Sequence, residues 1–123
     1  MTTLVKGQYP GGFLIWEVLR DYTRETVTIA SGAGKLAPGT VLGRITTGGN
    51  YTVLTPGASN GSQNAAGILW GQADATDAAA PAVVLVRGPA IVNRHEIIWP
   101  EGITEAQTTT ALTALAALGI IQR

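Results

Sequence analysis

A glycine-rich turn followed by lysine, Gly32-Ala33-Gly34-Lys35, is the segment most similar to a phosphate-binding loop. The P-loop motif requires a glycine five positions before its Gly-Lys pair and a serine or threonine after the lysine, because these residues cradle phosphates and bind Mg²⁺. The chain has Ile29 and Leu36 at these two positions. The segment is therefore predicted to be a turn and not a nucleotide site.

The single histidine, His95, would act as a general base only if a carboxylate such as Glu96 or Asp74 oriented it. Adjacent residues on a strand point to opposite faces, so Glu96 is poorly placed and a surface histidine is preferred. Asp74 and Asp77 lack the alternating oxygen ligands and the terminal glutamate of an EF-hand loop, and we expect solvated loop acids. No metal, no cofactor and no catalysis are expected. An enzyme would require His95 to converge with Asp74, Asp77 or Glu101 in one pocket.

The composition narrows the function classes further. The 123 residues include 8 basic and 8 acidic side chains, so the chain lacks the basic surface expected of a nucleic-acid-binding protein. It has no cysteine, which excludes disulfides and thiolate chemistry, and no apolar run long enough for a membrane span. With 13% charged residues and 16 glycines, we expect one turn-rich domain whose rather apolar exterior binds a protein partner. Nucleic acid, membrane and small-molecule substrates are not expected.

Short apolar and β-branched runs separated by Gly, Pro and Asn turns predict about eight strands. The strongest, 82–86, has no breaker and suits burial on both faces. Loops are predicted at 56–64 and 72–81. Because no helices alternate with the strands, we expect a mainly β, barrel-like or sandwich core with one helix appended. The other predicted strands are 13–19, 26–30, 40–46, 51–54, 65–70, 90–92 and 97–99.

One helix is specified near the C-terminus. Thr104 and Gln107 have the spacing of a capping box, in which each side chain bonds the backbone amide of the other residue. Gly119 is expected to adopt the left-handed conformation that ends a helix, so that Ile120 folds back onto the last turn at Leu115. Three leucines form an apolar stripe that is expected to pack on a sheet: Leu112, Leu115 and Leu118.

Residues 1–16 are predicted to form a flexible N-terminal arm ahead of a single β-rich domain, 17–123. Ordering roughly ten residues costs about 1–2 kcal/mol each, and burying four large apolar side chains returns about 1.5–3 kcal/mol each. One arm is therefore marginal, whereas several arms of an oligomer bind together through effective concentration. The alternative is that Phe13 and Trp16 belong to the domain core. The candidate contacts are Tyr9, Phe13, Leu14, Ile15 and Trp16.

Several segments, in this order, resemble the head decoration proteins of lambda-like tailed bacteriophages. They are 25–32, 36–43, 65–69, 81–84 and the block from Trp99-Pro100-Glu101 to Ile121. The resemblance implies an α+β fold of the β-clip type, mainly β with one C-terminal helix and an incomplete barrel of short strands. The best family markers are Trp99, Pro100, Glu101, Thr104 and Gly119.

The resemblance also implies a function. Such a protein is a structural component of the virion, expected as a homotrimer on the outer surface of the expanded capsid at local threefold sites. Its partner would be the major capsid protein, which it would stabilise against internal DNA pressure, with N-terminal arms that order on the capsid.

Two other classes stay open. A tail or baseplate module that binds host glycans would expose Trp70 and Trp99 as stacking platforms. An enzyme on a β-clip scaffold would need the pocket around His95 described above.

Overall fold

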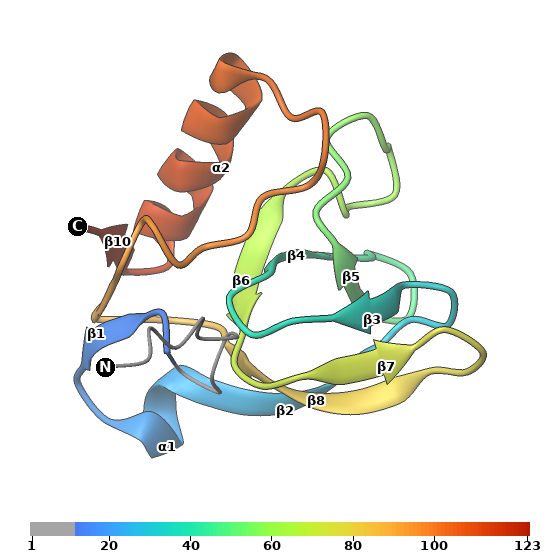
Figure 1. Cartoon of the computed structure of the whole chain (residues 1–123), viewed down its shortest axis with the longest axis horizontal. Coiled ribbons are helices and arrows are strands. Elements are labelled where there is room, and N and C mark those ends of the chain that lie inside the picture. The colour runs from blue at the N-terminus through green and yellow to red at the C-terminus, as the bar shows by residue number, and fades with distance from the viewer. Residues whose placement is uncertain (1–11) are drawn as a thin grey trace, which may run out of the picture.

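The computed structural model describes residues 12–123, which form ten strands and two helices (Figure 1). The strands are β1 (Leu14–Glu17), β2 (Arg24–Ile29), β3 (Gly34–Leu36), β4 (Val41–Arg44), β5 (Tyr51–Val53), β6 (Ala65–Leu69), β7 (Ala73–Ala75), β8 (Ala80–Leu85), β9 (Ala90–Val92) and β10 (Ile120–Gln122). The helices are the single turn α1 (Arg20–Thr23) and the long helix α2 (Glu105–Ala117). Neither of these two helices is long and apolar enough to span a membrane.

Five strands pair as a small barrel in the order β2-β5-β4-β6-β8. Strand β8 returns to β2 and pairs along its whole length, from Arg24 opposite Leu85 to Ile29 opposite Ala80. The β2–β5 seam, in contrast, contains a single pair, Ile29 with Tyr51. The barrel is therefore almost open on one side. The predicted fold class, mainly β with an incomplete barrel and one C-terminal helix, is confirmed.

Strands β1, β9 and β10 form a separate three-stranded sheet with β9 in its centre. Strand β1 runs antiparallel to β9, and β10 runs parallel to it. Helix α2 contacts both β10 and the barrel strand β6, so it joins this sheet to the barrel (Figure 1).

Two apolar clusters fill the fold, and three barrel strands separate them. Adjacent residues of β4, β6 and β8 point to opposite sides, which gives these strands two buried faces. One residue from each, Val41, Ile68 and Leu85, faces the cluster under α2, and its neighbour, Leu42, Leu69 or Val84, faces the barrel interior. The predicted central strand at 82–86 is confirmed, although Val83 stays 38% exposed.

Three predicted segments differ from the structure. The predicted turn at 32–35 is shorter than expected, since its last two residues already belong to β3. The predicted loop 72–81 contains β7, which pairs with β3 because Ala73 and Ala75 are buried in the barrel cluster. The predicted strand 97–99 is wrong, since Ile98 forms only an isolated bridge with Thr40. Pro100 follows directly and has no N–H to extend the pairing.

Helix α2 begins and ends as predicted. The Gln107 N–H donates to Thr104 Oγ1 at 3.1 Å, and the Thr104 N–H donates to Gln107 Oε1 at 3.0 Å. Gly119 has φ +89 and donates its N–H to the Ala116 carbonyl at 2.9 Å. Ile120 is buried in the same apolar cluster as Leu115 and also begins β10.

The predicted leucine stripe is wrong at its C-terminal end. Ala111 and Leu115 are the buried positions of α2, at the i, i+4 spacing of one helix face. Leu112 is half-buried and Leu118 is 36% exposed. Leu118 is the C-cap, where the chain leaves the helix and turns into β10.

Thr104→Ala is expected to lower the free energy of unfolding by about 1 kcal/mol, because the Gln107 N–H loses its acceptor. Urea unfolding followed by circular dichroism measures this. The control is Thr109→Ala, whose hydroxyl donates to the Glu105 carbonyl within the helix. It is expected to be neutral or slightly stabilising, because alanine has the higher helix propensity. Equal losses in the two variants would contradict the capping role.

Candidate protein interface

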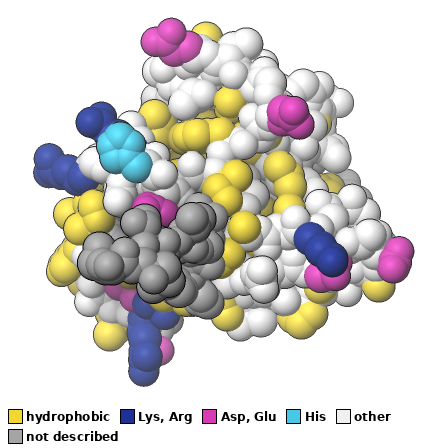
Figure 2. Space-filling model, in the orientation of Figure 1, with side chains coloured by type: hydrophobic (Ala, Val, Ile, Leu, Met, Phe, Trp, Pro, Cys, Tyr) yellow, Lys and Arg dark blue, Asp and Glu magenta, His cyan; other side chains and the backbone are white. Residues whose placement is uncertain are grey.

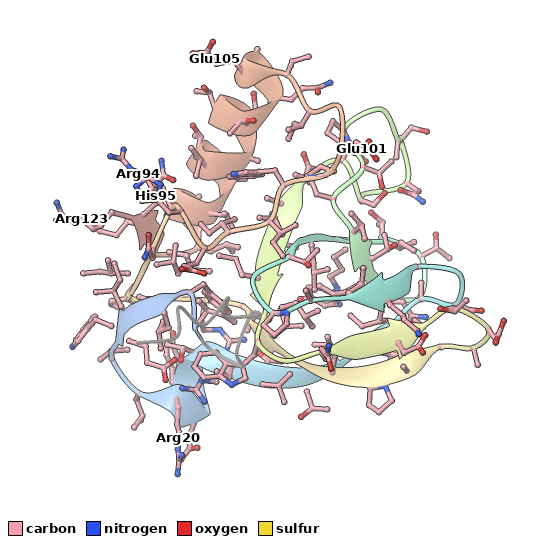
Figure 3. All side chains as sticks on the ribbon, in the orientation of Figure 1. Arg20, Arg94, His95, Glu101, Glu105 and Arg123 are labelled. Carbon is pink, nitrogen blue, oxygen red and sulfur yellow. The ribbon has the colours of Figure 1, made fainter. Side chains whose placement is uncertain are left out.

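The residues considered as catalytic groups, His95, Asp74 and Glu101, lie far apart in the structure (Figures 1 and 3). Charged side chains are scattered over the visible face of the molecule (Figure 2). His95 lies beside Arg94 and Arg123, at the ends of β9 and β10, whereas Glu101 lies well away from it (Figure 3). Strand β7, which carries Asp74, is on the opposite side of the fold (Figure 1). Across residues 12–123, no three histidine or acidic side chains gather as potential metal ligands.

Two of these segments have local structural roles. Gly34 and Lys35 begin β3 after a turn at Gly32, which has φ +90. Asp74 is exposed and accepts from the Thr76 hydroxyl at 2.7 Å and from the Thr76 N–H at 3.1 Å. The hydroxyl bond, followed by the amide bond, holds the pKa of Asp74 below its ordinary value. Asp74 is therefore exposed to solvent, as predicted, but it lies on strand β7 and not in a loop.

The outer face of the three-stranded sheet is apolar. Trp16 lies opposite Ile91 on the central strand, and Ile121 lies beside Ile91 on its other side. Residues paired across strands share one face of a sheet, so these three side chains form a row. The other face carries Ala90, Val92 and Ile120 into the main core.

A β-bulge adds a fourth apolar side chain to this face. Leu14 pairs with Val92 and Trp16 pairs with Ile91, so two residues of β1 stand opposite one residue of β9. A bulge of this kind interrupts the alternation of side chains and re-aims one of them. Ile15 is accordingly 54% exposed and Trp16 is 50% exposed. We call Ile15, Trp16, Ile91 and Ile121 the apolar sheet face.

The segment that follows β1 in the chain also exposes apolar side chains. Val18, Leu19 and Tyr22 are 49%, 57% and 53% exposed. Apart from Val83 and Leu118, the large exposed apolar side chains of residues 12–123 all belong to this segment or to the apolar sheet face. Contiguous surfaces of this kind mark protein interaction sites, and Trp, Tyr and Arg are the residues that dominate binding energy there.

The structure separates the predicted arm residues. Phe13 is 2% exposed and lies in the main core, and Leu14 packs against the same cluster. Ile15 and Trp16 point outward, and Tyr9 lies outside the described residues. The folded domain therefore already includes Phe13, ahead of the predicted boundary at residue 16. The alternative, a core position, holds for Phe13 and not for Trp16.

The two tryptophans proposed as sugar platforms are partly buried against the main cluster. The Arg24 guanidinium covers the face of Trp70, with its central carbon 3.3 Å from the ring centroid. The Phe13 ring meets Trp70 edge-on at 5.7 Å. Trp70 therefore does not offer an open indole face for a sugar.

The family markers flank α2: four lie in the segment between β9 and the helix, and Gly119 lies between the helix and β10. Trp99 and Pro100 are half-buried and Glu101 is exposed, while Thr104 caps the helix and Gly119 ends it. None of these five residues lies on the apolar sheet face. A structural role for these positions stays a prediction.

Sequence reasoning missed Ile91 and Ile121. Ile91 is the middle residue of the wholly apolar strand β9, between buried Ala90 and Val92, and Ile121 directly follows buried Ile120 in β10. Apolar residues at consecutive positions in a strand place one of them on the second face. This was the available signal, but only the pairing with β1 shows that the second face is exposed.

The fold and this surface define a class of protein: a small structural domain that binds other proteins. The family model of the bacteriophage lambda head decoration protein D matches residues 3–120, nearly the whole chain, and the chain belongs to that family. Its role is decoration of the phage head, with the capsid as its partner and location. No curated protein matches the chain.

Proposed function

We propose that the chain binds as a homotrimer to the outer surface of the expanded head, at local threefold sites, and cements neighbouring subunits of the major capsid protein. The role is mechanical and not catalytic: bridged subunits resist internal DNA pressure because several contacts must fail together. Family membership supports the capsid as partner. The observation that carries the binding site is the exposed Trp16, in a row with Ile91 and Ile121 on the apolar sheet face.

The contact begins with burial of this face. Removing apolar surface from water contributes about 25 cal/mol per Å², and a tryptophan supplies a large area with only two side-chain torsions. Arg94 and Arg123 flank one end of the face and offer hydrogen bonds to capsid carboxylates or carbonyls (Figure 3). These features support a central apolar contact with a polar rim.

The arm is a second part of the proposal. Residues 1–11, including Tyr9, precede β1, which is an edge strand of its sheet. We propose that they extend the contact by adding main-chain hydrogen bonds to a capsid strand. Three such contacts in a trimer raise avidity through effective concentration, and they engage together only when the capsid sites have the spacing of the expanded shell.

Cosedimentation with expanded capsids tests the proposed site. Trp16→Ser and Ile121→Ser are each expected to weaken binding at least about tenfold, as for central residues of an interface. Val83→Ser is the matched control, since Val83 is 38% exposed against 42% for Ile121 but lies on the barrel wall. It is expected to bind normally.

Each part of the proposal has its own contrary result. Normal binding by Trp16→Ser and Ile121→Ser would refute the apolar sheet face, and failure of the unaltered chain to bind expanded capsids would refute the decoration mechanism. If a chain that lacks residues 1–11 binds as well as the full chain, the proposed role of the arm in binding is refuted. Equal binding to unexpanded and expanded shells would refute the proposed geometric selectivity. A monomer in sedimentation equilibrium at binding concentrations would refute the proposed trimer.

A further inference from the structure

The two ends of β1 are fixed to the same tryptophan. At the first end, Phe13 is buried and its ring makes a T-shaped contact with Trp70, with the ring centroids 5.7 Å apart and an interplanar angle of 74°. At the second end, Glu17 binds Arg24, and the central carbon of the Arg24 guanidinium lies over the Trp70 ring, 3.3 Å from its centroid. Ile15 and Trp16 lie between these anchors.

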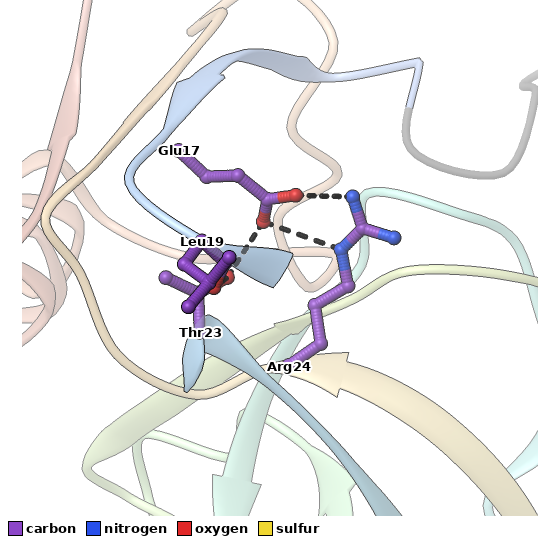
Figure 4. A network of polar contacts seen from close by, with 4 residues as sticks. All are labelled: Glu17, Leu19, Thr23 and Arg24. Carbon is purple, nitrogen blue, oxygen red and sulfur yellow. Dashed lines mark hydrogen bonds and ion pairs between the residues drawn. The ribbon is translucent and has the colours of Figure 1, made fainter. Parts of the chain in front are cut away.

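The second anchor is a dense polar network (Figure 4). Glu17 Oε2 accepts from the Thr23 hydroxyl at 2.6 Å and from Arg24 Nε at 3.2 Å, while Arg24 Nη2 donates to Glu17 Oε1. The Thr23 hydroxyl also bonds the Leu19 carbonyl at 3.1 Å. The side chains of Glu17 and Arg24 are only 10% and 20% exposed, so water screens this pair poorly. The network joins β1, α1 and β2.

We propose that Arg24 is a positioning residue for capsid binding: it holds β1 as a rigid platform that presents Ile15 and Trp16 before the capsid arrives. This inference rests on the proposed function. Arg24 itself is mostly buried, on β2, and is not part of the apolar sheet face. Its effect passes through Glu17 and Trp70. A platform ordered in advance spares the entropy that a flexible arm would lose on binding.

Arginine is required at this position for geometric reasons. Its planar fork meets both carboxylate oxygens of Glu17 while its face stacks on the indole, and the ammonium group of lysine cannot do both. Arg24→Lys therefore keeps the charge and loosens the second end of β1. Arg87→Lys is the matched control: Arg87 lies two residues after β8 and also pairs with a glutamate, Glu25 on β2, but this pair is exposed.

The test combines capsid cosedimentation with amide hydrogen exchange, at a temperature where circular dichroism shows every variant folded. Arg24→Lys is expected to weaken capsid binding about tenfold and to speed exchange of the β1 amides at least tenfold, with β8 unchanged. Arg87→Lys is expected to change neither. In a Trp16→Ser background, Arg24→Lys is expected to cause little further loss of binding, because its effect passes through the face that is already impaired.

Normal binding by folded Arg24→Lys would overturn the inference. So would an undiminished tenfold loss in the Trp16→Ser background, because Arg24 would then act by another route. If Arg24→Lys does not fold, Glu17→Gln, which keeps the side-chain shape, takes its place with the same expectations. If the unaltered chain does not bind capsids, the proposed function fails, and β1 exchange still decides whether Arg24 orders the platform.

Discussion

Replacing Phe13 with alanine is expected to lower the free energy of unfolding by about 3–5 kcal/mol. Phe13 is 2% exposed, lies in the same cluster as Leu115 and Ile120, and packs against the edge of Trp70. Its loss leaves a cavity between the three-stranded sheet and the barrel. Urea or thermal unfolding measures the effect, and it is large because surrounding backbone cannot fully close such a cavity.

Trp16→Ala is the informative companion to this variant. Trp16 is three positions further along the chain but is 50% exposed, so its removal is expected to cost about 1 kcal/mol from cross-strand packing with Ile91. We therefore expect different effects of the two variants: Phe13→Ala mainly lowers the free energy of unfolding, and Trp16→Ala mainly weakens capsid binding. A neutral Phe13→Ala variant would show that residue 13 belongs to a detached arm, as the sequence had suggested.

Leu115→Ala is expected to cost about 2–5 kcal/mol in the free energy of unfolding. Leu115 is 1% exposed and faces the main cluster from α2, next to Ala111. The helix connects the barrel to the three-stranded sheet, so this variant should also speed amide exchange in β10, which contacts α2. Denaturant unfolding and hydrogen exchange check both expectations.

Leu118→Ala tests whether α2 packs through its buried positions, as the structure has it, or through the predicted leucine stripe. A uniform stripe of Leu112, Leu115 and Leu118 would give similar losses at all three positions. Because Leu118 is 36% exposed at the C-cap, its truncation is expected to cost about 1 kcal/mol or less. Equal losses at 115 and 118 would contradict the packing of α2 described above.

Features that depend on neighbouring residues were predicted well. The capping box of Thr104 and Gln107, the left-handed Gly119 and the central strand at 82–86 are all present. Each rests on interactions within a few positions of the chain, or on an apolar run that nearly any β-rich fold would bury. For the same reason, the failed P-loop match at Gly32-Ala33-Gly34-Lys35 could be judged from spacing.

Features that depend on distant pairing were predicted poorly. The strand β7 was missed because Ala73 and Ala75 become buried only when β3 pairs with them. Residues 13–16 were assigned to the arm because nothing in the composition of the run 13–19 distinguishes a core strand from an adhesive segment. The exposure of both Ile15 and Trp16, which are adjacent in the strand, depends on the bulge opposite Ile91.

The sequence by itself determined the fold class, the ends of the C-terminal helix and the family, because these follow from local spacing and from the order of motifs along the chain. Only the tertiary structure decided which apolar residues face solvent. Strand alternation divides residues between two faces, but the residues that pack against the strand decide which face becomes buried. Here Trp16 lies opposite Ile91 of β9 on the outer face, and Phe13 packs against the Trp70 ring in the core. The candidate binding surface is therefore a product of long-range pairing between residues 14–17, 90–92 and 120–122.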